Sequence, residues 1–205
     1  MAQHVCALGI VLIAPSNRLA PEYKLPCAYE DALACLVHVH AHANSFGGDI
    51  NRVVLSGHSA GGHLASLIAL RRQSKMHSSI RACLPISAIM DLHHPAPPPG
   101  SLEERVYKLV LEKPLDDAAL SPICWAAANR IPFELSTGEH DSERVLLSNR
   151  RLNALLQSQD APVALHEQAG LTHFDTHTTL SQATHPWYAL LASHSHSQSG
   201  KAVPT

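Results

Sequence analysis

The fold is decided by residues 53–65, which read VVLSGHSAGGHLA. A short β-branched run leads into a Gly-x-Ser-x-Gly core, Gly57 to Gly61, and small and apolar residues follow at helical spacing. This order predicts a strand, a sharp turn and a helix. Glycines on both sides of the serine suit a strained and crowded turn, which lifts the serine hydroxyl clear of the sheet. Ser59 is therefore the candidate nucleophile.

Length and composition set the class of protein. The chain has 205 residues, of which 45% are hydrophobic, enough for one substantial core in one domain. The net charge of -2 offers no basic patch for nucleic acid, so a small neutral or weakly charged substrate suits this chain better. No apolar run is long enough to cross a bilayer, which predicts a soluble protein with no membrane partner.

The cysteines and histidines indicate neither a disulfide framework nor a metal centre. The five cysteines are odd in number and contain no Cys-x-x-Cys pair, so we interpret them as reduced thiols of a cytoplasmic protein. His38 and His42 lie four residues apart and would share a helix face, a spacing that can chelate a metal. No His-Glu-x-x-His pattern accompanies them, and a solvated helix face is the favoured interpretation.

The rest of the chain alternates between strands and helices. The apolar run 5–14 predicts a buried strand of a parallel sheet rather than a signal peptide, because no Lys or Arg precedes it. Further strands are expected at 52–55, 81–87, 131–136 and 163–167, and helices at 29–43, 60–71, 142–157 and 186–192. This alternation predicts an α/β fold with a mostly parallel sheet and helices on both faces.

Two segments fall outside this alternation. The proline-rich stretch between His93 and Gly100 and an amphipathic helix at 102–111 form an excursion, residues 91–122, which we interpret as a lid or pocket wall. The tail 193–205 is rich in Ser, His and Gly and is predicted to be disordered. The expected domain therefore covers residues 1–192.

Three residues could form a catalytic relay. A serine hydroxyl needs a base to take its proton, and the base needs an acid to fix its tautomer. Ser59, Asp141 and His173 each follow the C-terminal end of an expected strand, at the edge where open parallel sheets bind ligands. Their order along the chain is also the order of the α/β-hydrolase fold. We predict that these three residues are catalytic.

Each assignment has a competitor. Glu139 could be the acid in place of Asp141, which could serve only as the N-cap of the next helix. His166 and His177 compete with His173 for the role of base. The position of His173 in a loop directly after a strand favours it.

Further segments carry a family resemblance. They are LAPE (19–22), FGGDINR (46–52), GHSAGGHL (57–64), IS (86–87) followed by DL (91–92), LSP (120–122) and THFD (172–175). Together they resemble the arylformamidase (kynurenine formamidase) branch of the α/β-hydrolases and its esterase relatives. Hormone-sensitive-lipase-like esterases share LAPE but usually carry Asp before the serine, where this chain has His58. That difference favours the formamidase and feruloyl-esterase-like side.

The resemblance implies a reaction and a set of roles. The reaction is hydrolysis of an aryl formamide or a small ester through an acyl-enzyme, with no metal or organic cofactor; a carboxylesterase or lipase-like enzyme is the alternative. His173 would deprotonate Ser59, and Asp141 would orient His173. His58 and Asp91 are the candidate substrate-binding residues.

The same resemblance places the oxyanion at the N–H of Ala60 and at a donor from an earlier His-Gly-Gly loop. No His-Gly-Gly occurs before Ser59. We therefore expect an N-terminally truncated α/β-hydrolase fold with an exposed sheet edge, which invites pairing with another chain and leaves a homo-oligomer open. A non-catalytic remnant of the fold remains the second functional hypothesis.

Overall fold

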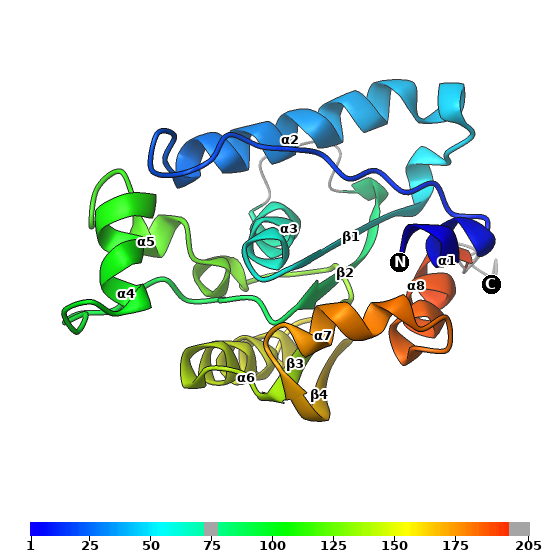
Figure 1. The fold of residues 1–205 in the computed structure, drawn as a ribbon. Helices are drawn as coiled ribbons and strands as arrows, with labels where there is room; N and C mark the ends of the chain where they lie inside the picture. Colours follow the sequence, from blue (N-terminus) through cyan, green and yellow to red (C-terminus); the bar gives the residue numbers. More distant parts are fainter. Residues whose placement is uncertain (72–77, 197–205) are drawn as a thin grey trace.

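The computed structural model describes residues 1–71 and 78–196, and its centre is a four-stranded parallel sheet (Figure 1). The strands are β1 (Val53–His58), β2 (Ile80–Ile86), β3 (Phe133–His140) and β4 (Val163–Thr172). They lie in sequence order, and every neighbouring pair is parallel. Parallel neighbours need crossover connections, so the predicted α/β class is confirmed.

Helices cover both faces of this sheet (Figure 1). The main ones are α1 (Ala2–Ala7), α2 (Leu25–His42), α3 (Ala60–Leu70), α6 (Glu143–Gln157) and α8 (Pro186–His196). Successive strand side chains point to opposite faces. On β2, Cys83 packs in one core with α2, α3 and α6, whereas Leu84 packs in a second core with α1 and α8. Strand β2, inside the sheet, is thus buried on both faces, as its nearly continuous apolar run predicts.

The expected excursion leaves the sheet between β2 and β3. It contains α4 (Leu102–Arg105), a π-helical turn (Val106–Val110) and α5 (Asp116–Ala119), so the helix predicted at 102–111 exists but changes pitch midway. Its anchor is Arg144 of α6, which donates to the main-chain carbonyls of Asp91 and Leu92 and pairs with Glu103 at 3.3 Å. The excursion is therefore tied to α6 despite its prolines.

The strand predicted at residues 5–14 is wrong. Val5 lies in α1, and residues 10–19 contain no regular element. A strand needs a hydrogen-bonded neighbour, but in the described residues β1 ends the sheet and pairs only with β2. Val11, Leu12 and Ile13 consequently stay about 40% exposed instead of buried.

The C-terminal tail also differs from expectation at its start. Residues 193–196 continue helix α8 rather than beginning a disordered tail, so this helix ends at His196 and not at residue 192. The remaining tail, 197–205, lies outside the described residues.

The turn after β1 has the predicted strain but not all of the predicted crowding. Ser59 adopts φ 52° and ψ −117°, which is unfavourable for a residue with a side chain. A Cβ on Gly57 would lie 2.4 Å from the carbonyl carbon of Gly61, and one on Gly62 would lie 2.9 Å from the Cβ of Ala88. A Cβ on Gly61 would meet nothing within 4 Å. Crowding therefore explains Gly57 and Gly62, whereas the prediction for Gly61 is wrong.

This contrast gives a matched pair of variants. Gly57→Ala should lower the free energy of unfolding by about 2 kcal/mol or more, because the new methyl group meets fixed backbone. Gly61→Ala should cause no loss, since Ala suits a helix better than Gly where space is open. Urea unfolding followed by circular dichroism measures both, and equal losses would contradict the close approach of β1 to α3.

Candidate active site

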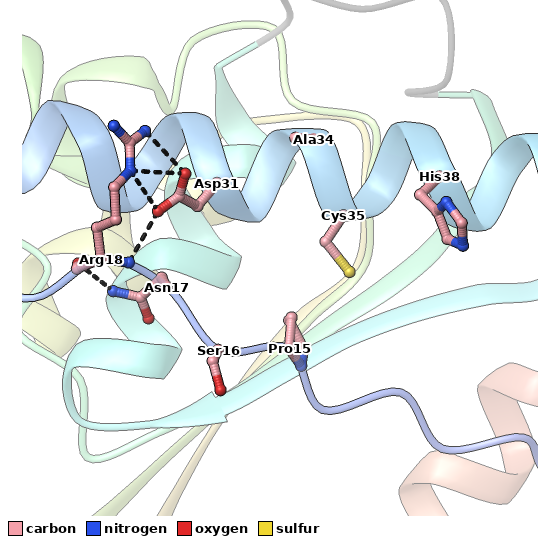
Figure 2. A pocket seen from close by; sticks show the side chains of 8 residues that line it. All are labelled: Pro15, Ser16, Asn17, Arg18, Asp31, Ala34, Cys35 and His38. Carbon is pink, nitrogen blue, oxygen red and sulfur yellow. Dashed lines mark hydrogen bonds and ion pairs between the residues drawn. The ribbon is translucent and has the colours of Figure 1, made fainter.

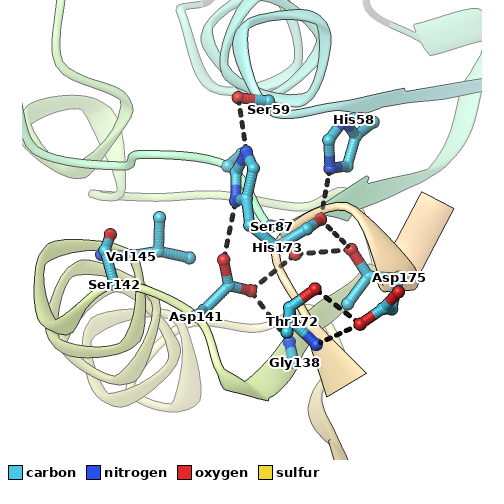
Figure 3. Close-up of polar contacts among 12 residues, drawn as sticks. His58, Ser59, Ser87, Gly138, Asp141, Ser142, Val145, Thr172, His173 and Asp175 are labelled. Carbon is cyan, nitrogen blue, oxygen red and sulfur yellow. Dashed lines mark hydrogen bonds and ion pairs between the residues drawn. The ribbon is translucent and has the colours of Figure 1, made fainter.

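Three loops bring the predicted relay together at the carboxyl edge of the sheet (Figure 3). Ser59 follows β1, Asp141 follows β3 and His173 follows β4. His173 Nε2 lies 3.1 Å from Ser59 Oγ, and His173 Nδ1 lies 2.6 Å from Asp141 Oδ1. The imidazole therefore stands between a hydroxyl and a carboxylate, the arrangement that can move a proton off the hydroxyl.

The carboxylate of Asp141 is buried, and every oxygen of it has a donor. Its side chain is 0% exposed. Oδ2 accepts hydrogen bonds from the N–H of Gly138 at 2.8 Å and from the hydroxyl of Ser87 at 2.6 Å, which leaves Oδ1 for His173. Because a carboxylate only accepts, His173 Nδ1 carries a proton and its Nε2 offers a lone pair to Ser59.

The main chain of His173, like its ring, makes two hydrogen bonds. Its carbonyl accepts hydrogen bonds from His58 Nε2 at 2.8 Å and from Thr176 Oγ1 at 2.7 Å. The His58 ring also lies against the rings of His173 and His177, with centroids 4.7 and 5.2 Å apart. Burial lowers the pKa of His58, so a neutral ring donates this bond. His58 thus contacts the loop that carries His173.

The second predicted substrate-binding residue, Asp91, is engaged with its surroundings. Its carboxylate pairs with Arg151 Nη1 at 2.7 Å and accepts from the N–H of His93 at 3.0 Å. A role in substrate binding stays a prediction for both Asp91 and His58.

The competing residues have other partners. Glu139 accepts a hydrogen bond from the N–H of Gly170 at 2.7 Å. His166 Nε2 pairs with Glu134 at 2.7 Å. The geometry therefore favours Asp141 and His173 over the competitors.

The predicted oxyanion donor, Ala60, is the first residue of α3. The first N–H groups of a helix have no acceptor within it, and an 11-residue helix adds the positive end of its dipole. The N–H of Ala60 can therefore serve an anion that forms next to Ser59.

A separate groove of about 630 Å³ lies between residues 15–18 and α2 (Figure 2). Its lining includes Cys35, His38 and an ion pair in which the Arg18 guanidinium donates to Asp31 at 2.8 Å. None of the relay residues lines it. The groove is therefore separate from the predicted relay.

The histidine pair His38 and His42 does not form a metal site in this structure. The rings of His38 and His42 share a face of α2 but stack at 4.3 Å, and His42 Nδ1 donates to the carbonyl of His38. In the part of the chain that the structure describes, no group of three or more His, Cys, Asp or Glu side chains could hold a metal ion.

No helix within 1–71 or 78–196 is long and apolar enough to cross a membrane. The five cysteines are unpaired.

The chain belongs to a family with the α/β-hydrolase fold, whose model matches residues 1–176. Lipase 2 of Moraxella sp. (strain TA144) is 46% identical over 66 residues, which are 32% of this chain and 15% of that one. A probable carboxylic ester hydrolase of Mycobacterium tuberculosis is 29% identical over 160 residues, 69% of this chain and 36% of that one. The chain thus spans about a third or less of the length of these relatives.

Solved structures show the same fold at greater sequence distance. A thermostable carboxylesterase cloned from a metagenomic library superposes with a TM-score of 0.80 at 21% identity, covering 95% of this chain and 72% of that one. An esterase from Pyrobaculum calidifontis gives 0.79 at 23% identity, covering 94% and 68%. These relatives are esterases and a lipase, so the formamidase branch suggested by His58 is not supported.

Buried histidines near the turn predict how stability depends on pH. Burial lowers the pKa of His63, whose Nδ1 donates to the carbonyl of Ile89 at 2.7 Å, and that of His58. Unfolded histidine, with a pKa of about 6.5, takes up a proton below that pH while the folded side chain resists it. Stability should therefore be full above pH 6.5 and fall as the pH drops toward the lowered folded values.

Urea midpoints measured between pH 7.5 and 5.0 check this prediction. His63→Gln should flatten the pH dependence, whereas His40→Gln, at an exposed position of α2, should not. The same slope in all three proteins would contradict it.

Proposed function

We propose that this protein is a serine hydrolase that cleaves a small carboxylic ester through an acyl-enzyme. The observation that carries the proposal is the relay in which His173 lies 3.1 Å from Ser59 Oγ and 2.6 Å from Asp141. The esterase and lipase relatives favour an ester over an aryl formamide.

The geometry of the relay supports a two-stage reaction in which His173 accepts and returns a proton in each stage. Ser59 Oγ attacks the ester carbonyl carbon while its proton passes to His173 Nε2, and Asp141 stabilises the resulting imidazolium. The tetrahedral intermediate then expels the alcohol, which takes that proton from Nε2 and leaves the acyl group on Ser59. A water molecule repeats the sequence, with His173 as base, and releases the carboxylic acid.

The proposed oxyanion donor is the N–H of Ala60, the first residue of α3. The first N–H groups of this helix have no acceptor within it. Loss of one such donor typically lowers kcat by about 10²–10³-fold. The hydrogen bond from this N–H to the tetrahedral intermediate is therefore expected to contribute to kcat.

The surface beside the relay supports an uncharged substrate. Phe174 is 72% exposed, and its ring lies edge-on to that of His173, with centroids 5.2 Å apart. An exposed aromatic ring next to the base offers an apolar contact for an acyl or aryl group. The net charge of -2 agrees with a substrate that carries little charge.

Hydrolysis of p-nitrophenyl acetate and butyrate tests the nucleophile. Ser59→Ala should lower kcat/KM by at least about 10³-fold, because the attacking oxygen is removed. Ser56→Ala is the matched control: this serine precedes the turn on β1, and its hydroxyl donates to the carbonyl of Leu84 at 2.7 Å. The control should keep the wild-type rate.

A second substrate separates the two chemistries. N-formylkynurenine should be cleaved with a lower kcat/KM than the acetyl ester. The reverse ranking would restore the formamidase hypothesis, and equal rates for Ser59→Ala and the wild type would remove the nucleophile assignment.

A further inference from the structure

Ser87, the residue that follows β2, has no part in the relay, but its geometry is unusual. Its φ of 48° lies in the left-handed region, and its side chain is wholly buried. Its N–H donates to the carbonyl of Ser136 at 2.7 Å, which fixes it to the middle of β3. Strained conformations of this kind persist where the surroundings hold them, and they cluster at functional sites.

The Ser87 hydroxyl begins a buried chain of contacts between the acid and the base (Figure 3). It donates to Asp141 Oδ2 at 2.6 Å and lies 2.8 Å from Thr176 Oγ1, on a residue that is also wholly buried. Thr176 in turn donates to the main-chain carbonyl of His173 at 2.7 Å. Two hydroxyl groups thus connect the carboxylate of the acid to the backbone of the base.

The hydroxyls of Ser87 and Thr176 have two protons between them but make three contacts with acceptor atoms. Carboxylates and carbonyls only accept, so Ser87 donates to Asp141 and Thr176 donates to His173. The contact between the two hydroxyl oxygens must share one of these two protons. His58 also donates to the His173 carbonyl, so Thr176 can turn its proton toward Ser87 without leaving that carbonyl unpaired.

The contact with Ser87 also sets the plane of the Asp141 carboxylate. Donors on Oδ2 from Ser87 and from the N–H of Gly138 fix the rotation of this group, so that Oδ1 faces His173 Nδ1. Without the Ser87 hydroxyl, Oδ2 keeps a single donor in a buried site. A buried acceptor that loses a partner is costly, and the carboxylate is then free to turn toward other donors.

We propose that Ser87 and Thr176 are positioning residues, which hold Asp141 and His173 in register with Ser59 without contacting substrate. The effect on kcat rests on the proposed function. The effect on the hydrogen bond between Asp141 and His173 does not.

Kinetics of four variants test the first effect. Ser87→Ala and Thr176→Val should lower kcat by about 10- to 100-fold with KM nearly unchanged, because a small misplacement of the relay slows the chemical step. Thr176→Ser keeps the hydroxyl and should retain the wild-type kcat. Ser148→Ala removes a buried hydroxyl of α6 that accepts from the N–H of Met90, and it should lose stability only.

A fifth variant separates the hydrogen bond from the backbone strain. Ser87→Gly relieves the positive φ but also lacks the hydroxyl. Its Tm should exceed that of Ser87→Ala, while its kcat stays equally low. Recovery of kcat in Ser87→Gly would overturn the proposal, because strain and not the hydroxyl would then be the cause.

Proton NMR tests the second effect without turnover. The wild type should show a far-downfield resonance for the His173 Nδ1 proton, identified by its loss in His173→Gln. Ser87→Ala and Thr176→Val should shift or broaden it, and Ser148→Ala should not. If these shifts are observed but the wild type hydrolyses no ester, the proposed function is wrong and the positioning role stands. An unchanged resonance in Ser87→Ala, or none in the wild type, would overturn the positioning role.

Discussion

The buried carboxylate of Asp141 is the constraint on which the site depends. A charge removed from water is tolerated only when hydrogen bonds replace the lost hydration. Here the replacements come from Gly138 on β3, Ser87 after β2 and His173 after β4. The ends of three neighbouring strands must therefore stay together for the charge to remain stable, and the same contacts aim the imidazole at Ser59.

The turn after β1 brings the end of this fourth strand next to the other three strand ends. The close approach of Gly57 and Gly62 lets α3 start directly above the end of β1, which holds Ser59 in its strained conformation. His58, one residue earlier, donates to the carbonyl of His173. The segments that carry Ser59 and His173 are thus linked through this hydrogen bond as well as through the two side chains. This arrangement is what supports the proposal of ester cleavage.

Much of this could be predicted from the sequence, because the strands, helices and relay have local signals. The alternation of apolar runs predicted the parallel sheet. The Gly57–Gly61 turn, with Asp141 and His173 after later strands, predicted the relay. The run at residues 5–14 misled because apolar composition cannot report whether a neighbouring strand exists. His58 alone could not indicate the class of substrate, since its ring contacts the loop that carries His173. Ser87 and Thr176 have no local pattern, and only the three-dimensional contacts reveal them.

The central claim is that Ser59 is an activated nucleophile. Covalent labelling with a fluorophosphonate, followed by mass spectrometry of the peptides, tests it most directly because the adduct identifies the attacking oxygen itself. The account predicts one adduct per chain, on Ser59, formed much more slowly in His173→Ala. No adduct, or an adduct on Ser59 at the same rate in His173→Ala, would contradict it.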